Sequence, residues 1–343
     1  MTMTFATVSC NHRASEHLAS LNVAYLDTTV APGADFYTYV NKGWMEAHPL
    51  TAEHARYGQF DILNDSSENR VKELIANLGT TNPEPGTVAH KVWTIYSQAM
   101  DTARRNREGA TPILADLKKI EETPHEGMED LFLWMHGNYA SPFFGAGPME
   151  DLANSQVYAM YLSNGGMGLG DRDYYLLDDE RNTAVRNAYR KLIATQMQNA
   201  GYAAADAARI TDNVMKIETA LAQKTLTREE SRDIPRMYNP RTFAQVKEVY
   251  PNVNWDRFFI ETMGIKSPDT LIVTEPEYLA QADKLMGSLS DREIKDYYLW
   301  KYVSQAASKL SDNFTQASFE FSKVMSGVQE IRPLWKRAID ATE

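Results

Sequence analysis

The sequence predicts a mainly α-helical fold with few short strands. Apolar residues recur at i, i+4, i+7 and i+11 along 210–221, which places them on one face of a helix. Ser290 followed by Glu293 forms a capping box, a signature of a helix N-terminus. The best strand candidate, 154–162, is short. Helical patterns therefore dominate the chain.

The elements follow in chain order. The segment that begins with Phe60-Asp61-Ile62-Leu63 opens a helix whose apolar spacing continues to Leu78, and the TTNPEPG run after Gly79 ends it. Further helices are predicted at 88–99, 113–120, 128–139, 185–193, 210–221, 241–249, 255–263, 290–310 and 314–325. Breaker residues fill 141–148, and Leu271-Ile272-Val273 is expected to be buried. No repeat of fixed period and no low-complexity linker divides the chain.

Composition narrows the class of protein. The 343 residues are 43% hydrophobic and 24% charged, which is ordinary for a globular protein with a sizeable core. The net charge of −11 argues against a nucleic-acid partner, whose surface would require clustered Lys and Arg. The sequence has no run of 18 apolar residues that could span a membrane.

The first 31 residues predict an N-terminal tether. Cys10 is the single cysteine, and the segment FATVSCN around it resembles the end of a bacterial lipoprotein signal. Thr7 stands where a Leu is usual, and the basic region and most of the apolar region of such a signal are absent. The alternative is a chance cysteine in a loose terminus. The lipoprotein interpretation makes Cys10 a candidate lipidation site and predicts export to the bacterial periplasm or cell envelope, with membrane contact only through the lipid.

The motifs of several hydrolases are absent. A helical zinc site needs two His four residues apart with a Glu between them, and no two of the seven His have that spacing. The sequence also contains no G-x-S-x-G elbow. The glycine-rich loop at 165–170 lacks nucleotide-binding spacing, so we expect a tight turn with positive φ at several glycines. Asp171 and Asp173 are expected to cap the following helix or to hold Arg172.

The stretch from Asp35 to Asp65 is unusually aromatic. It contains Phe36, Tyr37, Tyr39, Trp44, Tyr57 and Phe60. Aromatic side chains bury large areas, so this stretch is predicted to be a docking segment. Arg56 and Asp61 lie within it, and a buried charge is costly unless it is paired or used.

Several segments together resemble the neprilysin-like zinc metalloendopeptidases. PGADFYTYVNKGWMEAHPLTAEHARYGQFDILND is similar to the opening of that family, with its P-x-x-D-F-Y-x-Y-x-N-G-x-W and R-Y-G-x-F-D blocks. Residues 166–175 (GMGLGDRDYY) resemble the family's G-L-G-L-x-x-R-D-Y-Y, and 232–239, 297–303 and 327–336 resemble later blocks. The resemblance covers residues 32–343 in the right order.

The resemblance implies that residues 32–343 form the large helical N-terminal domain of such a peptidase, incomplete at its C-terminal end. In the family a thermolysin-like catalytic domain follows, with the H-E-x-x-H motif and a later zinc-binding Glu. Neither is in this sequence. The chain would then be the substrate-enclosing portion of an enzyme that hydrolyses oligopeptides. Zinc would belong to the complete enzyme, and the isolated chain would be inactive, with no bound metal and no catalytic residue of its own. Its partners would be the peptide and the missing catalytic domain.

Two residues receive a role through this resemblance. The family's R-Y-G arginine binds substrate on the primed side of the scissile bond, and the Asp of its F-D helps to position it. These fall on Arg56 and Asp61. The alternative is an ion pair that fixes the aromatic segment. Asn64 stands where the family's type member has a further Arg, and the inverted order of Asn41-Lys42-Gly43 predicts a local turn difference. The rival function is a non-catalytic, helical, peptide-binding envelope lipoprotein.

Overall fold

The computed structural model describes residues 22–138 and 140–342. The chain divides into two compact units between Asn69 and Arg70. The domain boundary predicted between residues 31 and 32 stays a prediction.

The smaller unit contains η1 (Val23–Tyr25), α1 (Phe36–Ala47) and the first part of α2 (Gln59–Thr81). Asp35 caps α1, because its Oδ1 accepts the backbone N–H of Thr38 at 3.0 Å. The turn predicted at Asn41-Lys42-Gly43 is wrong, since these residues lie inside α1. Gly43 is needed there because a Cβ would lie 2.7 Å from the carbonyl oxygen of Tyr25.

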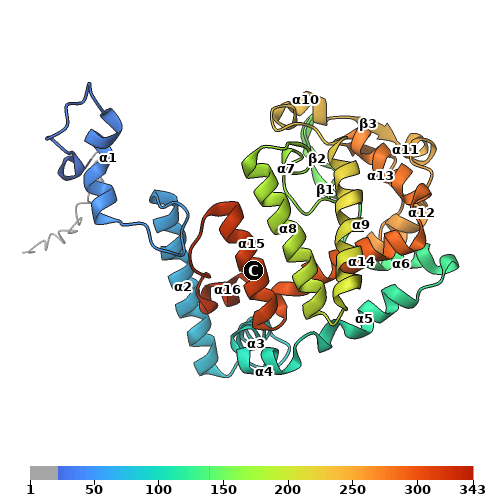
Figure 1. The fold of residues 1–343 in the computed structure, drawn as a ribbon, viewed down its shortest axis with the longest axis horizontal. Helices are drawn as coiled ribbons and strands as arrows, with labels where there is room; N and C mark the ends of the chain where they lie inside the picture. Colours follow the sequence, from blue (N-terminus) through green and yellow to red (C-terminus); the bar gives the residue numbers. More distant parts are fainter. Residues whose placement is uncertain (1–21, 139, 343) are drawn as a thin grey trace, which may run out of the picture. The chain divides into compact units, whose positions relative to one another are not determined.

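The larger unit is mainly α-helical, as predicted (Figure 1). Its helices after α2 are α3 (Val88–Met100), α4 (Thr102–Glu108), α5 (Thr111–Glu122), α6 (Met128–Gly137), α7 (Asp173–Leu176), α8 (Glu180–Asn199), α9 (Ala204–Ala222), α10 (Ile234–Met237), α11 (Phe243–Val249), α12 (Trp255–Arg257), α13 (Pro276–Ser288), α14 (Asp291–Ala306), α15 (Asp312–Ser326) and α16 (Leu334–Asp340). Short 3-10 turns are η2 (His125–Gly127), η3 (Glu230–Arg232) and η5 (Ala307–Lys309), and η4 (Phe258–Thr262) is a π-helical turn. The helices predicted at 255–263 and 290–310 are therefore each interrupted near one end.

The sheet is small and mixed. Its strands are β1 (Phe144–Asp151), β2 (Asn154–Asn164), β3 (Pro240–Thr242) and β4 (Thr270–Val273), in the order β1-β2-β4-β3. The hairpin β1–β2 is antiparallel, β2 pairs with β4 in parallel and β4 pairs with β3 antiparallel. The predicted break at 141–148 is wrong beyond Phe143, because β1 is an edge strand, where proline and glycine are tolerated.

The core lies where α8, α9 and α14 pack together, with α15 against α8. Helices α8 and α9 run side by side in Figure 1. The stripe predicted on 210–221 is confirmed, since Ile210, Val214, Ile217 and Leu221 are fully buried. The buried segment predicted at 271–273 forms the last three residues of β4, and all three are buried.

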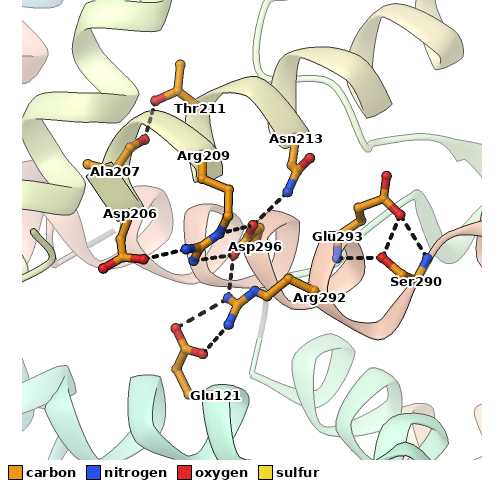
Figure 2. Close-up of polar contacts among 10 residues, drawn as sticks. All are labelled: Glu121, Asp206, Ala207, Arg209, Thr211, Asn213, Ser290, Arg292, Glu293 and Asp296. Carbon is orange, nitrogen blue, oxygen red and sulfur yellow. Dashed lines mark hydrogen bonds and ion pairs between the residues drawn. The ribbon is translucent and has the colours of Figure 1, made fainter. Parts of the chain in front are cut away.

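A polar network joins α5, α9 and α14 (Figure 2). Asp296 of α14 is fully buried and accepts hydrogen bonds from Arg209 and Asn213 of α9 and from Arg292 of its own helix. Arg292 also donates to Glu121 of α5, at 2.6 Å. The capping box predicted at Ser290 and Glu293 is confirmed at the start of α14. The network therefore fixes α5, α9 and α14 to one another.

Candidate functional site

The predicted substrate-binding residues lie at the start of α2. Arg56 is in the irregular segment before this helix, and Asp61 is in its first turn, where the helix dipole favours a carboxylate. Within residues 22–138 and 140–342 neither side chain makes a hydrogen bond or ion pair. The structure therefore does not join the two residues, and both side chains have their polar atoms available.

The expected burial of Arg56 is wrong. Arg56 is exposed, and so are three of the six aromatic side chains of the stretch: Phe60 is 88% exposed, Phe36 67% and Tyr37 66%. A guanidinium in water carries no desolvation cost, so it needs no partner. Other aromatics of the stretch do pack together, since Trp44 stacks on His48 with a centroid separation of 4.6 Å.

Two buried tyrosines, Tyr278 and Tyr297, form hydrogen bonds with the backbone of the glycine-rich loop. The Tyr278 hydroxyl donates to the carbonyl of Phe143 at 2.6 Å and accepts the N–H of Gly166 at 2.9 Å. The Tyr297 hydroxyl donates to the carbonyl of Gly166 at 2.6 Å. Phe143 has a φ of 64°, an unfavourable conformation for a side chain of this size. These contacts hold the strained backbone beside the loop.

Close packing explains the glycines of this loop. The predicted positive φ angles are wrong, since no glycine of 165–170 has one. A Cβ at Gly166 would lie 2.8 Å from side-chain atoms of Leu221, Tyr278 and Tyr297. A Cβ at Gly168 would lie 1.8 Å from the hydroxyl of Tyr189. Glycine is required at these two positions because the backbone approaches the core.

A buried carboxylate lies under the same loop. Glu218 of α9 is fully buried and accepts hydrogen bonds from the hydroxyls of Tyr175, at 2.6 Å, and Tyr189, at 3.1 Å. Burial raises the pKa of Glu218, and these hydroxyls and the charge of Lys301 oppose that shift. Sequence reasoning missed this residue. Its position between Ile217 and Leu221, on the buried face of α9, is the signal that could have identified it.

Asp171 and Arg172 have other partners than expected. Asp171 Oδ1 accepts the N–H of Asp173 at 3.0 Å, but the N-cap of α7 is Arg172 and its side chain makes no capping hydrogen bond, so the predicted cap is wrong. Its other oxygen accepts from Nε of Arg228 at 2.9 Å, whereas Arg172 donates to the carbonyl of Thr225 at 2.5 Å. The expectation that Asp171 holds Arg172 is therefore wrong, because Asp171 is paired with Arg228 and Arg172 with the carbonyl of Thr225.

These groups line a cavity of about 450 Å³ in the larger unit. Its walls come from 164–174 and 225–231 and from Glu275 and Met325. Glu275 is 8% exposed, and one of its oxygens accepts the N–H of Leu226 at 2.7 Å. Sequence reasoning missed Arg228 and Glu275 because they are distant from the loop along the chain.

The described residues do not fit a catalytic zinc ion. Among them no group of three His, Cys, Asp or Glu side chains is arranged to hold a metal. His125, which precedes Glu126 as in a zinc motif, contacts the carboxylate of Asp291 at 3.0 Å. Cys10 lies outside the described residues. In the described ranges, no helix is long and apolar enough to cross a bilayer.

The chain resembles known peptidases over nearly its whole length. It is 27% identical to endothelin-converting enzyme 1 of Bos taurus over 346 residues, which cover 97% of this chain and 45% of the relative. It is 24% identical to neprilysin-1 of Caenorhabditis elegans, over 92% of this chain and 45% of that protein. The chain spans about half the length of these relatives.

Solved structures show the same fold. The structure of the zinc metalloprotease Zmp1 of Mycobacterium tuberculosis with an inhibitor matches with a TM-score of 0.86 and 26% identity, over 94% of this chain and 49% of that one. PepO of Lactobacillus rhamnosis matches in fold with a TM-score of 0.75, at 17% identity, over 91% of this chain and 49% of that one.

The fold and the sequence thus match the helical N-terminal part of known metallopeptidases. The family model described as "Peptidase family M13" matches residues 32–343, so the chain belongs to peptidase family M13. The predicted neprilysin-like family is confirmed.

Proposed function

We propose that this chain is the substrate-enclosing portion of a zinc metalloendopeptidase that hydrolyses oligopeptides. The observation that carries the proposal is the match of residues 32–343 to the M13 family, together with the fold shared with Zmp1. The complete enzyme would use zinc to activate a water molecule. This chain would contribute the binding of the peptide.

Arg56 is proposed to bind the peptide. Its exposed guanidinium has no partner among the described residues, so its five N–H donors are available to a carbonyl or a terminal carboxylate. A planar guanidinium grips a carboxylate with two parallel hydrogen bonds. Asp61, at the start of the following helix, would orient that guanidinium when the peptide is bound.

Hydrolysis is proposed to need groups that this sequence does not contain. The H-E-x-x-H motif is absent from the 343 residues, and the described residues offer no metal-binding group. We therefore expect the isolated chain to bind peptides without cleaving them.

A titration of a fluorescent oligopeptide with the purified chain tests the role of Arg56. Arg56→Gln should weaken binding by about tenfold or more, because one charge-assisted hydrogen bond contributes roughly 1.5 to 3 kcal/mol. Arg56→Lys should weaken it less, since the charge remains. The matched control is Arg181→Gln, which removes another exposed arginine without a side-chain partner in the described residues and should bind as the parent does. Equal affinity of Arg56→Gln and the parent would refute the role.

We also propose that the protein is exported and anchored through Cys10. The support is the FATVSCN segment. Mass spectrometry of the protein expressed in a bacterium should find a lipid on Cys10, and Cys10→Ser should remove the protein from the membrane fraction. An unmodified Cys10 in membrane-free protein would contradict the anchor.

A further inference from the structure

The cavity beside the glycine-rich loop is not used by the proposed function. At about 450 Å³ it is within the size range of small-ligand sites. Four parts of the chain that are distant in sequence build it: the loop at 164–174, the segment 225–231, Glu275 just before α13 and Met325 of α15. All of them belong to the larger unit, and buried tyrosines fix the loop itself.

The polar groups of the cavity are held in place. Both oxygens of Glu275 accept hydrogen bonds, from the Asn164 side chain and from the N–H of Leu226. The guanidinium of Arg172 is fixed by the carbonyl of Thr225, and that of Arg228 by Asp171. The remaining N–H groups of both guanidiniums make no hydrogen bond within the described residues. They are available to a ligand, and their positions are set before it arrives.

The charges of the cavity balance, and one wall is apolar. Arg172 and Arg228 are matched by Asp171 and Glu275, so a phosphate or another strong anion would find no net positive charge. Met167, Leu169 and Met325 supply apolar surface. A ligand that suits both features is uncharged, carries amide donors and acceptors, and has an apolar side chain. A peptide segment has this chemistry.

We propose that this cavity is a second peptide subsite, in which Arg172 and Arg228 bind main-chain carbonyls and Met167, Leu169 and Met325 receive an apolar side chain. The choice of a peptide rests on the proposed function. The subsite itself is independent of Arg56 and Asp61, which belong to the other compact unit.

Gly170 offers a way to fill the cavity without disturbing the core. It lines the cavity, and a Cβ on it would meet nothing within 4 Å. Its φ is not positive, so a side chain causes no backbone strain. Gly170→Phe should therefore place a ring in the cavity mouth. The matched control is Gly147→Phe on β1, where a Cβ also meets nothing within 4 Å but which does not line the cavity.

The test is a fluorescence anisotropy titration with a labelled peptide that is acetylated and amidated at its ends and carries a central leucine. It is done in the parent chain and in an Arg56→Gln background, where the remaining binding reports this cavity. Gly170→Phe should raise the Kd by about tenfold or more, and Arg228→Gln should raise it several-fold. Gly147→Phe and Arg190→Gln, which removes an exposed arginine paired with Asp212, should leave it unchanged.

The outcomes separate the two proposals. If Gly170→Phe binds the peptide as the parent does, the second subsite is refuted, even where Arg56→Gln alone weakens binding. If the Arg56→Gln chain binds the peptide as the parent does and the Gly170→Phe chain binds it more weakly, the role of Arg56 is refuted and the subsite is supported. Competition by inorganic phosphate rather than by unlabelled peptide would overturn the assignment of a peptide to the cavity.

Discussion

Arg209 of α9 grips Asp296 of α14 with two nitrogen atoms. Its Nε and Nη2 donate to the two carboxylate oxygens at 3.1 and 3.2 Å (Figure 2). Asp296 is fully buried, and Arg292 and Asn213 donate to the same carboxylate. A buried carboxylate with this many donors is satisfied, and its charge is balanced by the two guanidiniums.

Removing this carboxylate should destabilise the larger unit strongly. Asp296→Ala leaves Arg209 and Arg292 without their shared acceptor, so the free energy of unfolding should fall by about 3 to 5 kcal/mol. Urea unfolding followed by tryptophan fluorescence measures the change. The control is Asp212→Ala, which breaks the exposed pair with Arg190 and should cost about 0 to 1 kcal/mol. Equal losses in the two variants would show that the buried network does not hold the helices.

The tyrosines under the glycine-rich loop should be equally sensitive. Tyr278→Phe leaves the buried carbonyl of Phe143 and the N–H of Gly166 without their partner, at a cost of about 2 to 4 kcal/mol. Amide hydrogen exchange at Gly166 should become faster in this variant. Tyr158→Phe, at a tyrosine that is 74% exposed, is the control and should be neutral. Unchanged exchange at Gly166 would contradict the clamp.

His136 should make the stability of the fold depend on pH. Its ring packs against Phe132, Phe144 and Phe258, at centroid separations of 4.6 to 5.1 Å, and its Nε2 is buried without a hydrogen-bond partner. Burial lowers the pKa of His136 to about 3, from an ordinary value of 6.5, and the charge of Lys301 contributes while a hydrogen bond with the backbone of Pro142 opposes.

Because the folded state disfavours the protonated ring, this stabilisation is complete above pH 6.5 and is lost as the pH falls towards 3. The loss should reach up to about 4 kcal/mol. His136→Phe should flatten the dependence of the unfolding free energy on pH in this window. His125→Phe is the control. The hydrogen bond with Asp291 and its charge raise the pKa of that exposed ring, so this substitution should not flatten the loss of stability at low pH. A parent and a His136→Phe variant with parallel pH profiles would refute the prediction.

The capping box of α14 should contribute measurably to stability. Ser290→Ala removes the acceptor of the Glu293 N–H and should cost about 1 kcal/mol. Hydrogen bonding to Lys216 and to Ser290 lowers the pKa of Glu293 to about 2, so its contribution should be present above pH 4.5 and disappear as the pH falls through about 2. Thermal unfolding at pH 7 and at pH 2 measures both effects. The control is Ser326→Ala, at the last residue of α15, which should change the unfolding free energy by less than about 0.5 kcal/mol.

Local patterns predicted most of the helices, and the strand predicted at 154–162 is confirmed as β2, but they missed β1. The apolar spacing of 210–221 corresponds to α9, because one buried face repeats every turn, and the spacing of 88–99 corresponds to α3, none of whose residues is fully buried. The glycines and Pro148 of β1 resemble a loop in sequence, and only the pairing with β2 makes them a strand. The strand β4 is only four residues long, and its pairing partner β2 is more than 100 residues earlier in the chain.

The candidate sites could be predicted only in part. The R-Y-G motif pointed to Arg56 as a candidate substrate-binding residue. The number of aromatic residues in the stretch did not show which of them would be exposed. Glu218 and its partner Tyr175 are 43 positions apart, and Arg228 is 57 positions from Asp171. Such contacts depend on how α7 and α9 pack, which no local pattern specifies. The cavity therefore emerges only from the folded chain.

This chain is proposed to bind peptides, while hydrolysis is proposed to depend on groups that its 343 residues do not contain. The most direct measurement combines zinc analysis of the purified chain with an assay of oligopeptide binding and cleavage on the same sample. We expect saturable peptide binding that Arg56→Gln weakens, no stoichiometric zinc and no cleavage. One equivalent of zinc, with peptide cleavage that a chelator stops and added zinc restores, would contradict the account.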